Sequence, residues 1–375
     1  MIKVITTVGA SIFTNYLDWK KDIENHINYI KNKPYKEYSN LFPRIKQIKE
    51  KITAWAASNV DASAEIKSLV KIQKVRNEPL DVYLLATETV ISALAAEIIR
   101  DWFAGDSNFT VRFNPVQDVI KGLQVNDYQV FVQRGLPNLV HRINTIAGGD
   151  HDKGGYFGNV IFNIAGGYKG VIPYMTILAQ VNNCDIYYIF EESQTIIKIP
   201  KTPIRIDYNI FDKYPQEITM LENGIEKYQQ QKNEHYAVFD ELEKMGLVEI
   251  AGDLAVLSPL GVIFFEKYKS WTYHFFCSDE VWNEIQEHKD IKRILSEKFY
   301  NSAARENKTE IKQTHMVYDD GDNQNRIYYF KNNDDIYIYK TFQDESAAKK
   351  YISTPLNKSE VIKKSKRRQW RLANV

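Results

Sequence analysis

The sequence predicts an α/β fold in which a parallel sheet comes first and two smaller modules follow it. Apolar runs of strand length alternate with helical stretches through the first two hundred residues, which is typical of a parallel sheet. After Asp207 the pattern changes to polar helices and then to a helix, a hairpin and a second helix. The last hundred residues contain strands in succession with helices before and after them, which indicates a small α+β domain.

The composition limits the classes of protein to which the chain can belong. A length of 375 residues suits two or three domains, and a net charge of +1 favours no partner by itself. Cys184 and Cys277 lie far apart, so we expect no disulfide framework and a reducing, cytoplasmic location. We expect no metal site, because two cysteines and seven scattered histidines give too few ligands. No signal peptide and no membrane-spanning run are recognised, so no membrane partner is expected.

The first part of the chain supplies the elements of the predicted sheet. Strands are expected at 1–7, 81–89, 109–116 and 160–164, and helices at 42–73, 90–103 and 130–147. The helix at 42–73 is expected to be interrupted at Asn59-Val60-Asp61, and the helix at 130–147 to be broken near Pro137. A polar loop is expected at 148–158.

The stretch VIFNIAGGYKGVIPYMTILAQV, residues 160–181, predicts a buried strand, a double-glycine turn and a helix. Gly166 and Gly167 allow a sharp turn and a close approach of the backbone to a ligand. Tyr168 and Lys169 follow where the helix is expected to begin, and free N–H groups there attract anions. The turn therefore suits a ligand that carries phosphate, with Lys169 as its counter-charge, although a tight turn without any ligand remains the alternative.

A second loop is expected to complete this site. The segment TTVGASIFTN, residues 6–15, follows the first strand, and a polar turn follows the strand at 81–89. Loops at strand ends meet where the strand order of such a sheet reverses, and ligands bind in that crevice. The candidate ligand residues of these two loops are Gly9, Ala10, Ser11, Asn15, Thr87 and Glu88.

Three blocks together resemble the CARF domains of CRISPR-associated accessory proteins: TTVGASIFTN, NIAGGYKG and DIYYIFEESQTIIKIPKTPIRID, the last at 185–207. The resemblance covers about the first 205 residues and implies a Rossmann-like domain that binds a cyclic oligoadenylate. It implies cyclic tetra-adenylate as the allosteric activator, with cyclic hexa-adenylate left open. A cyclic ligand with internal two-fold symmetry fits a two-fold interface, so we expect a homodimer.

The middle of the chain predicts a helical connector and a small module. After a polar helix at 215–231, the segment 235–268 predicts a helix capped by Gly246, a hairpin around Gly252-Asp253 and a helix that begins at Ser258-Pro259. This segment resembles a winged-helix module. It carries two lysines against six acidic residues, which argues against DNA binding and favours a linker or dimerisation role.

The last hundred residues predict an α+β domain with a basic end. Strands are expected at 271–276, 314–320, 325–332 and 334–343, and helices at 278–303, 344–353 and 357–371. The final helix would carry seven basic residues against Glu360. A solvated helix face would explain this charge, but a polyanionic partner explains it better, since more basic residues lie in the same domain. The candidate RNA-binding residues are Lys363, Lys364, Arg367, Arg368 and Arg371.

The order RIYYF, DDIYIYKTFQ, KKYISTP and KKSKRR over 271–375 resembles the RelE/HigB superfamily of toxin ribonucleases. The resemblance implies an mRNA interferase that acts on mRNA and the ribosome. Such enzymes work without metal: the RNA 2′-hydroxyl attacks the adjacent phosphate, which fixed cations stabilise while a base and an acid move protons. Arg326 matches the strand arginine of the family and is expected to stabilise the phosphate. The other candidate catalytic residues are Lys340, Lys349, Lys350, Tyr351 and His315.

These expectations combine into one hypothesis with one rival. The chain is expected to contain a CARF sensor (1–207), a helical connector with a winged-helix module (208–270) and a RelE-like ribonuclease (271–375). The rival is a ligand-responsive transcription regulator that binds DNA through the winged helix. A HEPN ribonuclease is rejected, because Arg305 and His315 are too far apart for its Arg-x4–6-His motif and the region predicts strands.

Overall fold

The computed structural model describes residues 1–124, 126–149, 155–189, 195–203, 206–321, 324–333 and 335–372. It divides into two compact units, one of Met1–Asp150 with Gly155–Lys267 and one that contains Tyr268–Val375. Part of the polar loop expected at 148–158 lies outside the described residues. The predicted domain boundaries at 207 and 270 stay predictions.

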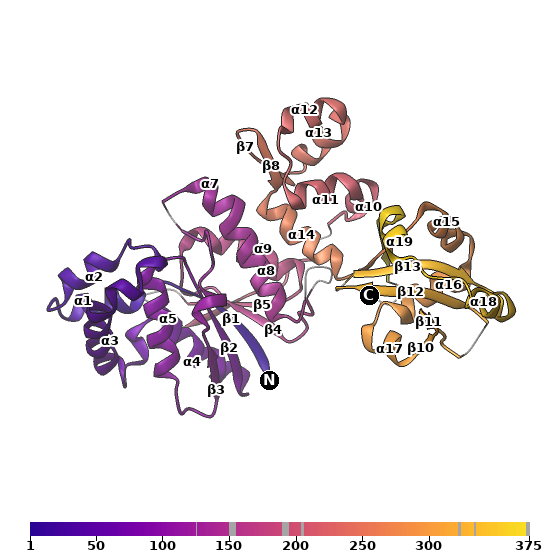
Figure 1. Cartoon of the computed structure of the whole chain (residues 1–375). Coiled ribbons are helices and arrows are strands. Elements are labelled where there is room, and N and C mark those ends of the chain that lie inside the picture. The colour runs from indigo at the N-terminus through magenta and orange to yellow at the C-terminus, as the bar shows by residue number, and fades with distance from the viewer. Residues whose placement is uncertain are drawn as a thin grey trace. The chain divides into compact units, whose positions relative to one another are not determined.

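The first unit is built on a six-stranded sheet with the order β3-β2-β1-β4-β5-β6, of which Figure 1 labels β1 to β5. Its strands are β1 (Ile2–Val8), β2 (Leu80–Ala86), β3 (Phe109–Arg112), β4 (Val160–Asn163), β5 (Asp185–Ile189) and β6 (Ile196–Ile199). The first five strands run parallel, and β6 pairs antiparallel with β5. The chain builds outward from β1 to β3 and then returns to place β4 beside β1. The strand order therefore reverses between β1 and β4, and the α/β class is confirmed.

The helices of this part follow the predicted alternation. They are α1 (Ser11–Trp19), α2 (Glu24–Ile30), α3 (Phe42–Ala56), α4 (Ala64–Arg76), α5 (Val90–Trp102), α6 (Pro115–Asp118), α7 (Tyr128–Val130), α8 (Leu136–Ile146) and α9 (Ile172–Val181). The predicted interruption at 59–61 is confirmed as a 3-10 turn between α3 and α4. The predicted break near Pro137 takes the form of a π-helical turn, Phe131–Gly135, that leads into α8, and Pro137 lies in the first turn of α8.

The segment 208–269 has the predicted helix, hairpin and helix. Its elements are α10 (Asn209–Lys213), α11 (Pro215–Asn223), α12 (Tyr228–Glu234), α13 (Tyr236–Lys244), β7 (Val248–Ala251), β8 (Leu254–Leu257) and α14 (Pro259–Lys269). Gly246 and Gly252 have φ of 70° and 62°, the left-handed conformation in which glycine is favoured. Ser258 Oγ accepts the N–H of Gly261 at 3.0 Å, as expected of an N-cap.

The second unit is a six-stranded mixed sheet with helices. The strand order is β10-β11-β12-β13-β9-β14, with only β13 and β9 parallel among the described pairs. The strands are β9 (Thr272–Cys277), β10 (Thr309–Lys312), β11 (His315–Tyr318), β12 (Arg326–Asn332), β13 (Asp335–Phe342) and β14 (Lys366–Arg371). The helices are α15 (Asp279–Glu287), α16 (Lys289–Ile294), α17 (Ser302–Asn307), α18 (Glu345–Tyr351) and α19 (Lys358–Lys364), with a π-helical turn at Leu295–Phe299.

The predicted final helix at 357–371 is wrong over its second half. Helix α19 ends at Lys364, and Lys366–Arg371 form β14, which pairs antiparallel with β9. The Trp370 ring meets the Trp282 ring edge-on at 5.7 Å between centroids, and the Arg368 guanidinium lies 5.1 Å from the centroid of Trp282. Basic side chains have long apolar stems, so a strand rich in them can cover aromatic residues while its charged ends reach water.

Within the described part of the chain, none of the helices is both long and apolar enough to span a bilayer.

Candidate functional site

The loops after β1 and β4 lie against each other at the point where the strand order reverses. A Cβ atom on Gly9 would lie 3.0 Å from the Gly167 nitrogen, a tight contact with backbone, and one on Gly167 would lie 2.6 Å from the Thr7 hydroxyl oxygen. Gly167 has a φ of 95°, and the Thr7 hydroxyl donates to the Gly166 carbonyl at 2.9 Å. The structure thus brings the predicted residues Gly9, Gly166 and Gly167 together.

A fully buried carboxylate fills the space between these loops. Glu65, in the first turn of α4, accepts the N–H of Gly9 at 2.8 Å through Oε1 and the hydroxyl of Ser11 at 2.7 Å through Oε2. A Cβ atom on Gly166 would lie 2.2 Å from Glu65 Oε1. Glu65 was not predicted from the sequence, although one signal was available: it lies one turn before Leu69 on the buried face of α4, an acid where apolar residues are expected.

A second buried polar layer lies under the β4 turn. Asn163, at the end of β4, donates to the Ser68 hydroxyl at 2.8 Å, and Ser68 in turn donates to the Glu65 carbonyl at 3.0 Å. The Asn163 side chain also accepts the N–H of Ala165 at 3.3 Å. These bonds tie the double-glycine turn to α4 and fix the loop conformation.

The other predicted ligand residues lie around this crevice with partners of their own. Asn15 donates to the carbonyls of Asp61 and Ala62, both at 3.2 Å. The Thr87 N–H donates to Ser92 Oγ, whose hydroxyl donates to the Val8 carbonyl, so the β2 end is linked to the β1 end.

Glu88 serves a different loop, since its carboxylate accepts the N–H of Gly122 at 2.8 Å. The Tyr168 ring packs edge-on against Phe131 at 5.5 Å. Lys169 is exposed and begins the 3-10 turn Lys169–Val171 that precedes α9. Ala10 is half-buried and directly precedes α1.

The predicted catalytic residues of the second unit differ in their accessibility. His315 is buried: its Nε2 lies 2.8 Å from the Thr354 carbonyl and its Nδ1 lies 2.7 Å from the Tyr339 hydroxyl. Because a carbonyl only accepts, Nε2 donates to Thr354, and in the neutral imidazole Nδ1 then accepts from the Tyr339 hydroxyl. Both ring nitrogens are therefore engaged within the protein.

The predicted cations are also paired to different degrees. Arg326 is 7% exposed, forms an ion pair with Asp319 at 2.7 Å and donates to the Asn325 carbonyl. Lys340 pairs with Glu284 at 2.5 Å. Lys349 and Lys350 are exposed on α18, and Lys349 pairs with Glu345 one turn earlier.

An open groove in the second unit is lined by three of the predicted residues, Lys340, Tyr351 and Lys364. Tyr339 and Asn357 line it as well. Burial raises the pKa of the Tyr339 and Tyr351 phenols, so both hydroxyls stay protonated at neutral pH. The groove therefore combines aromatic rings and hydroxyl donors with two ammonium groups, and the carboxylates of Glu280 and Glu360 line it too.

The basic end of the chain is only partly available for a polyanion. Lys363 and Lys364 are exposed on α19, and Lys364 pairs with Glu360 at 2.6 Å. Arg368 pairs with Asp279 and is half-buried on Trp282. Arg367 is half-buried on β14, and the side chain of Arg371 lies outside the described residues.

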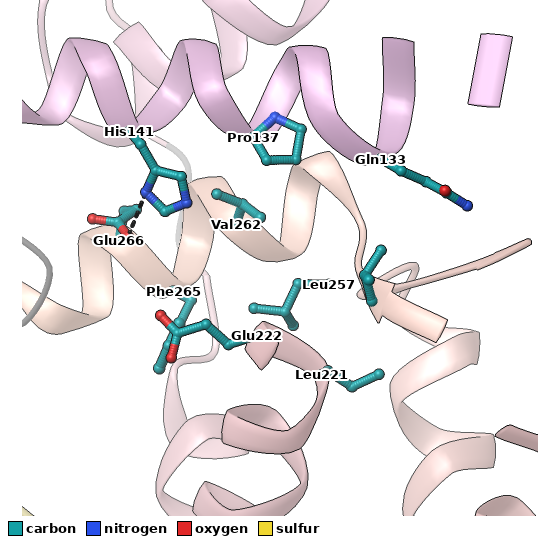
Figure 2. Close-up of a pocket in the computed structure, with 10 residues that line it drawn as sticks. Gln133, Pro137, His141, Leu221, Glu222, Leu257, Val262, Phe265 and Glu266 are labelled. Carbon is teal, nitrogen blue, oxygen red and sulfur yellow. Dashed lines mark ion pairs between the residues drawn. The ribbon is translucent and has the colours of Figure 1, made fainter. Parts of the chain in front are cut away.

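The first unit also holds a small pocket between α8, α11, β8 and α14 (Figure 2). Leu221, Leu257, Val262 and Phe265 form its apolar wall. On its rim, His141 Nδ1 of α8 lies 3.3 Å from Glu266 Oε1 of α14.

The buried carboxylate of Glu266 on α14 also accepts a hydrogen bond from the side-chain amide of Asn144 on α8, at 2.8 Å. None of the predicted ligand residues lines this pocket, which lies apart from the residues of the crevice. Among the residues described, no group of three or more His, Cys, Asp or Glu side chains is placed to hold a metal ion.

The chain was compared with known protein families. Residues 60–202 match the family model of a CRISPR-associated protein, Cas_APE2256. The matched segment contains Glu65 and the double-glycine turn but begins after the Gly9 loop. No curated protein matches the chain. The family match supports a CRISPR-associated protein and a role in CRISPR defence.

Proposed function

We propose that the chain is a cyclic-oligoadenylate-activated endoribonuclease of CRISPR defence, with a sensor in the first unit and an RNA-cleaving effector in the second. One observation carries the proposal: two glycine-dependent loops meet at the reversal point of a parallel sheet, in a unit that contains the segment matched to a CRISPR-associated family. Ligands bind at such reversal points.

Cyclic tetra-adenylate is the proposed activator, bound across a homodimer. Its phosphates would meet backbone N–H groups of the Gly166–Lys169 turn, with the exposed Lys169 as a counter-charge. Each protomer would supply one copy of the loops to the two-fold ligand. Activation requires that the ligand bind one state of the dimer more tightly than the other.

In the second unit, the groove around Lys340, Tyr351 and Lys364 is the proposed RNA site. A base takes the proton of the RNA 2′-hydroxyl as its oxygen attacks the adjacent phosphorus, and an acid protonates the 5′-oxygen as its bond to phosphorus breaks. The products are a 2′,3′-cyclic phosphate and a 5′-hydroxyl. Once Lys340 leaves Glu284 and Lys364 leaves Glu360, their ammonium groups stabilise the charge on the phosphate oxygens, and the tyrosine rings stack on bases.

Arg326 and His315 would act directly only after a rearrangement. Arg326 would have to leave Asp319, and His315 would have to release either Tyr339 or Thr354. Their assignment as catalytic residues stays a prediction, as does that of Lys349 and Lys350.

A ligand-responsive transcription regulator is the second candidate, because α13, β7, β8 and α14 have the helix–hairpin–helix order of a winged helix. The excess of acidic residues in this segment weighs against DNA binding.

The test is a cell-free translation reaction with labelled mRNA, with and without cyclic tetra-adenylate, beside the same mRNA without ribosomes. Cleavage that requires the ligand supports the proposal, and the tube without ribosomes decides whether ribosomes take part. Lys340→Ala should reduce cleavage at least tenfold, roughly the loss of one transition-state contact. Lys331→Ala is the matched control, since Lys331 is an exposed lysine of the same sheet that pairs with Glu306 and does not line the groove. If the protein binds cyclic tetra-adenylate and duplex DNA but cleaves no RNA, the transcription regulator is favoured.

A further inference from the structure

Glu65 is the most unusual buried charge of the first unit. Its side chain is 0% exposed, and its carboxylate accepts from neutral donors, the Gly9 N–H and the Ser11 hydroxyl. None of the described lysines, arginines or histidines forms an ion pair with it. Burying a carboxylate that has no cationic partner costs folding free energy, so a glutamate at this position needs an explanation.

The donors around Glu65 are the type of group that binds phosphate. Gly9 directly follows β1, and Ser11 begins α1, a nine-residue helix whose N-terminus carries partial positive charge. Gly166 closes the space from the β4 side, because its missing side chain leaves room for the carboxylate. Glu65 therefore occupies an anion site built from both loops.

We infer that Glu65 sets the affinity of the crevice for phosphate: it holds the Gly9–Ser11 donors in the free protein and repels the ligand phosphates that approach them. This inference rests on the proposed ligand crevice and names a residue that tunes it. Two negative charges a few ångströms apart in a partly buried site oppose each other strongly. Removing the charge at position 65 should therefore strengthen binding of a polyanion, whereas a purely structural residue would weaken it when changed.

The test compares Glu65→Gln with Glu65→Asp in the full-length protein by isothermal titration calorimetry. Glutamine keeps the size and an acceptor for the Gly9 N–H but removes the charge, while aspartate keeps the charge and disturbs the geometry. The probes are cyclic tetra-adenylate and inorganic tripolyphosphate. We expect Glu65→Gln to bind tripolyphosphate about tenfold or more tighter than the parent chain. Glu65→Asp should show no such gain.

The two probes separate this inference from the proposed function. If Glu65→Gln gains affinity for tripolyphosphate while no variant binds cyclic tetra-adenylate, the inference holds and the oligoadenylate assignment fails. Equal or weaker binding of tripolyphosphate by folded Glu65→Gln overturns the inference, as does an equal gain in Glu65→Asp. If Glu65→Gln does not fold, Glu65→Ala, which leaves space for water at the donors, is measured against the same expectation.

Discussion

At the scale of single residues, burial separates side chains that hold the fold from those that can reach a ligand. His315 and Lys340 were both candidates for catalysis, yet His315 is 1% exposed with both nitrogens bonded, whereas Lys340 lines a groove. The His315 ring also contacts the Tyr328 and Tyr351 rings, at 5.5 Å and 5.8 Å. Its contacts therefore predict a contribution to stability.

His315→Ala should lower the free energy of unfolding of the second unit by about 2–4 kcal/mol. The change removes packed ring atoms and leaves the Tyr339 hydroxyl and the Thr354 carbonyl without their partner. Urea unfolding followed by circular dichroism measures the loss. Lys349→Ala, on the exposed face of α18, should change stability by less than about 0.5 kcal/mol. An His315→Ala protein of unchanged stability that has lost cleavage would instead favour the catalytic assignment.

At the scale of elements, the basic end of the chain forms a strand where its local sequence favours a helix, because it pairs with β9. A run of lysine and arginine suits a solvated helix, but β9 offered an open edge and Trp282 offered an apolar surface. Six residues, Lys366–Arg371, pair with β9 along their whole length. The charge at this end is therefore divided between an exposed helix, α19, and an edge strand whose Arg368 is committed to packing.

Trp370→Ala should lower the free energy of unfolding of the second unit by about 1–3 kcal/mol, because the half-buried indole covers Trp282. Ile362→Ala is the matched control, since Ile362 is 37% exposed on α19 and should lose less than about 1 kcal/mol. Chemical denaturation of both variants gives the comparison. If the two losses are equal, β14 does not anchor the sheet edge.

Elements with strong periodicity could be predicted from the sequence, and elements defined by distant partners could not. The strands at Ile2–Val8 and Val160–Asn163 follow from apolar runs, and the hairpin at 248–257 follows from glycines in left-handed turns. Strand β10, Thr309–Lys312, was missed because its residues alternate weakly and Ile311 is 77% exposed. Its strand form comes from pairing with β11.

The residues of the candidate site also fall into those that could be predicted from the sequence and those that could not. The two glycine loops were predicted from local signals and lie together, as the reversal of strand order requires. Glu65 could not be assigned to the crevice, because its partners Gly9 and Ser11 lie more than fifty residues away. The buried face of α4 marks Glu65 as unusual, but the long-range hydrogen bonds that place it in the crevice leave no trace in one sequence.

At the scale of the whole molecule, two units with separate cores carry the proposed sensing and cleavage. One core gathers around Val4, Leu84 and Ile161, and the other around Phe275 and Ile327. Units with their own cores are able to unfold separately. Each unit also contains one buried free cysteine, Cys184 in the first and Cys277 in the second.

These cysteines should report the unfolding of each unit independently. Burial raises the pKa of both thiols to about 12, so the reactive thiolate is nearly absent from the folded protein at pH 8. Unfolding returns each pKa to its ordinary range near 8.5, and alkylation then becomes fast. Pulsed iodoacetamide labelling across a urea series, read by peptide mass spectrometry, should give no labelling of the native protein and a separate midpoint for each cysteine. His315→Ala should lower only the Cys277 midpoint, because its broken contacts lie in the second unit. A single midpoint that shifts for both cysteines would mean that the two units unfold cooperatively. A change that stabilises the proposed sensor would then also stabilise the proposed effector.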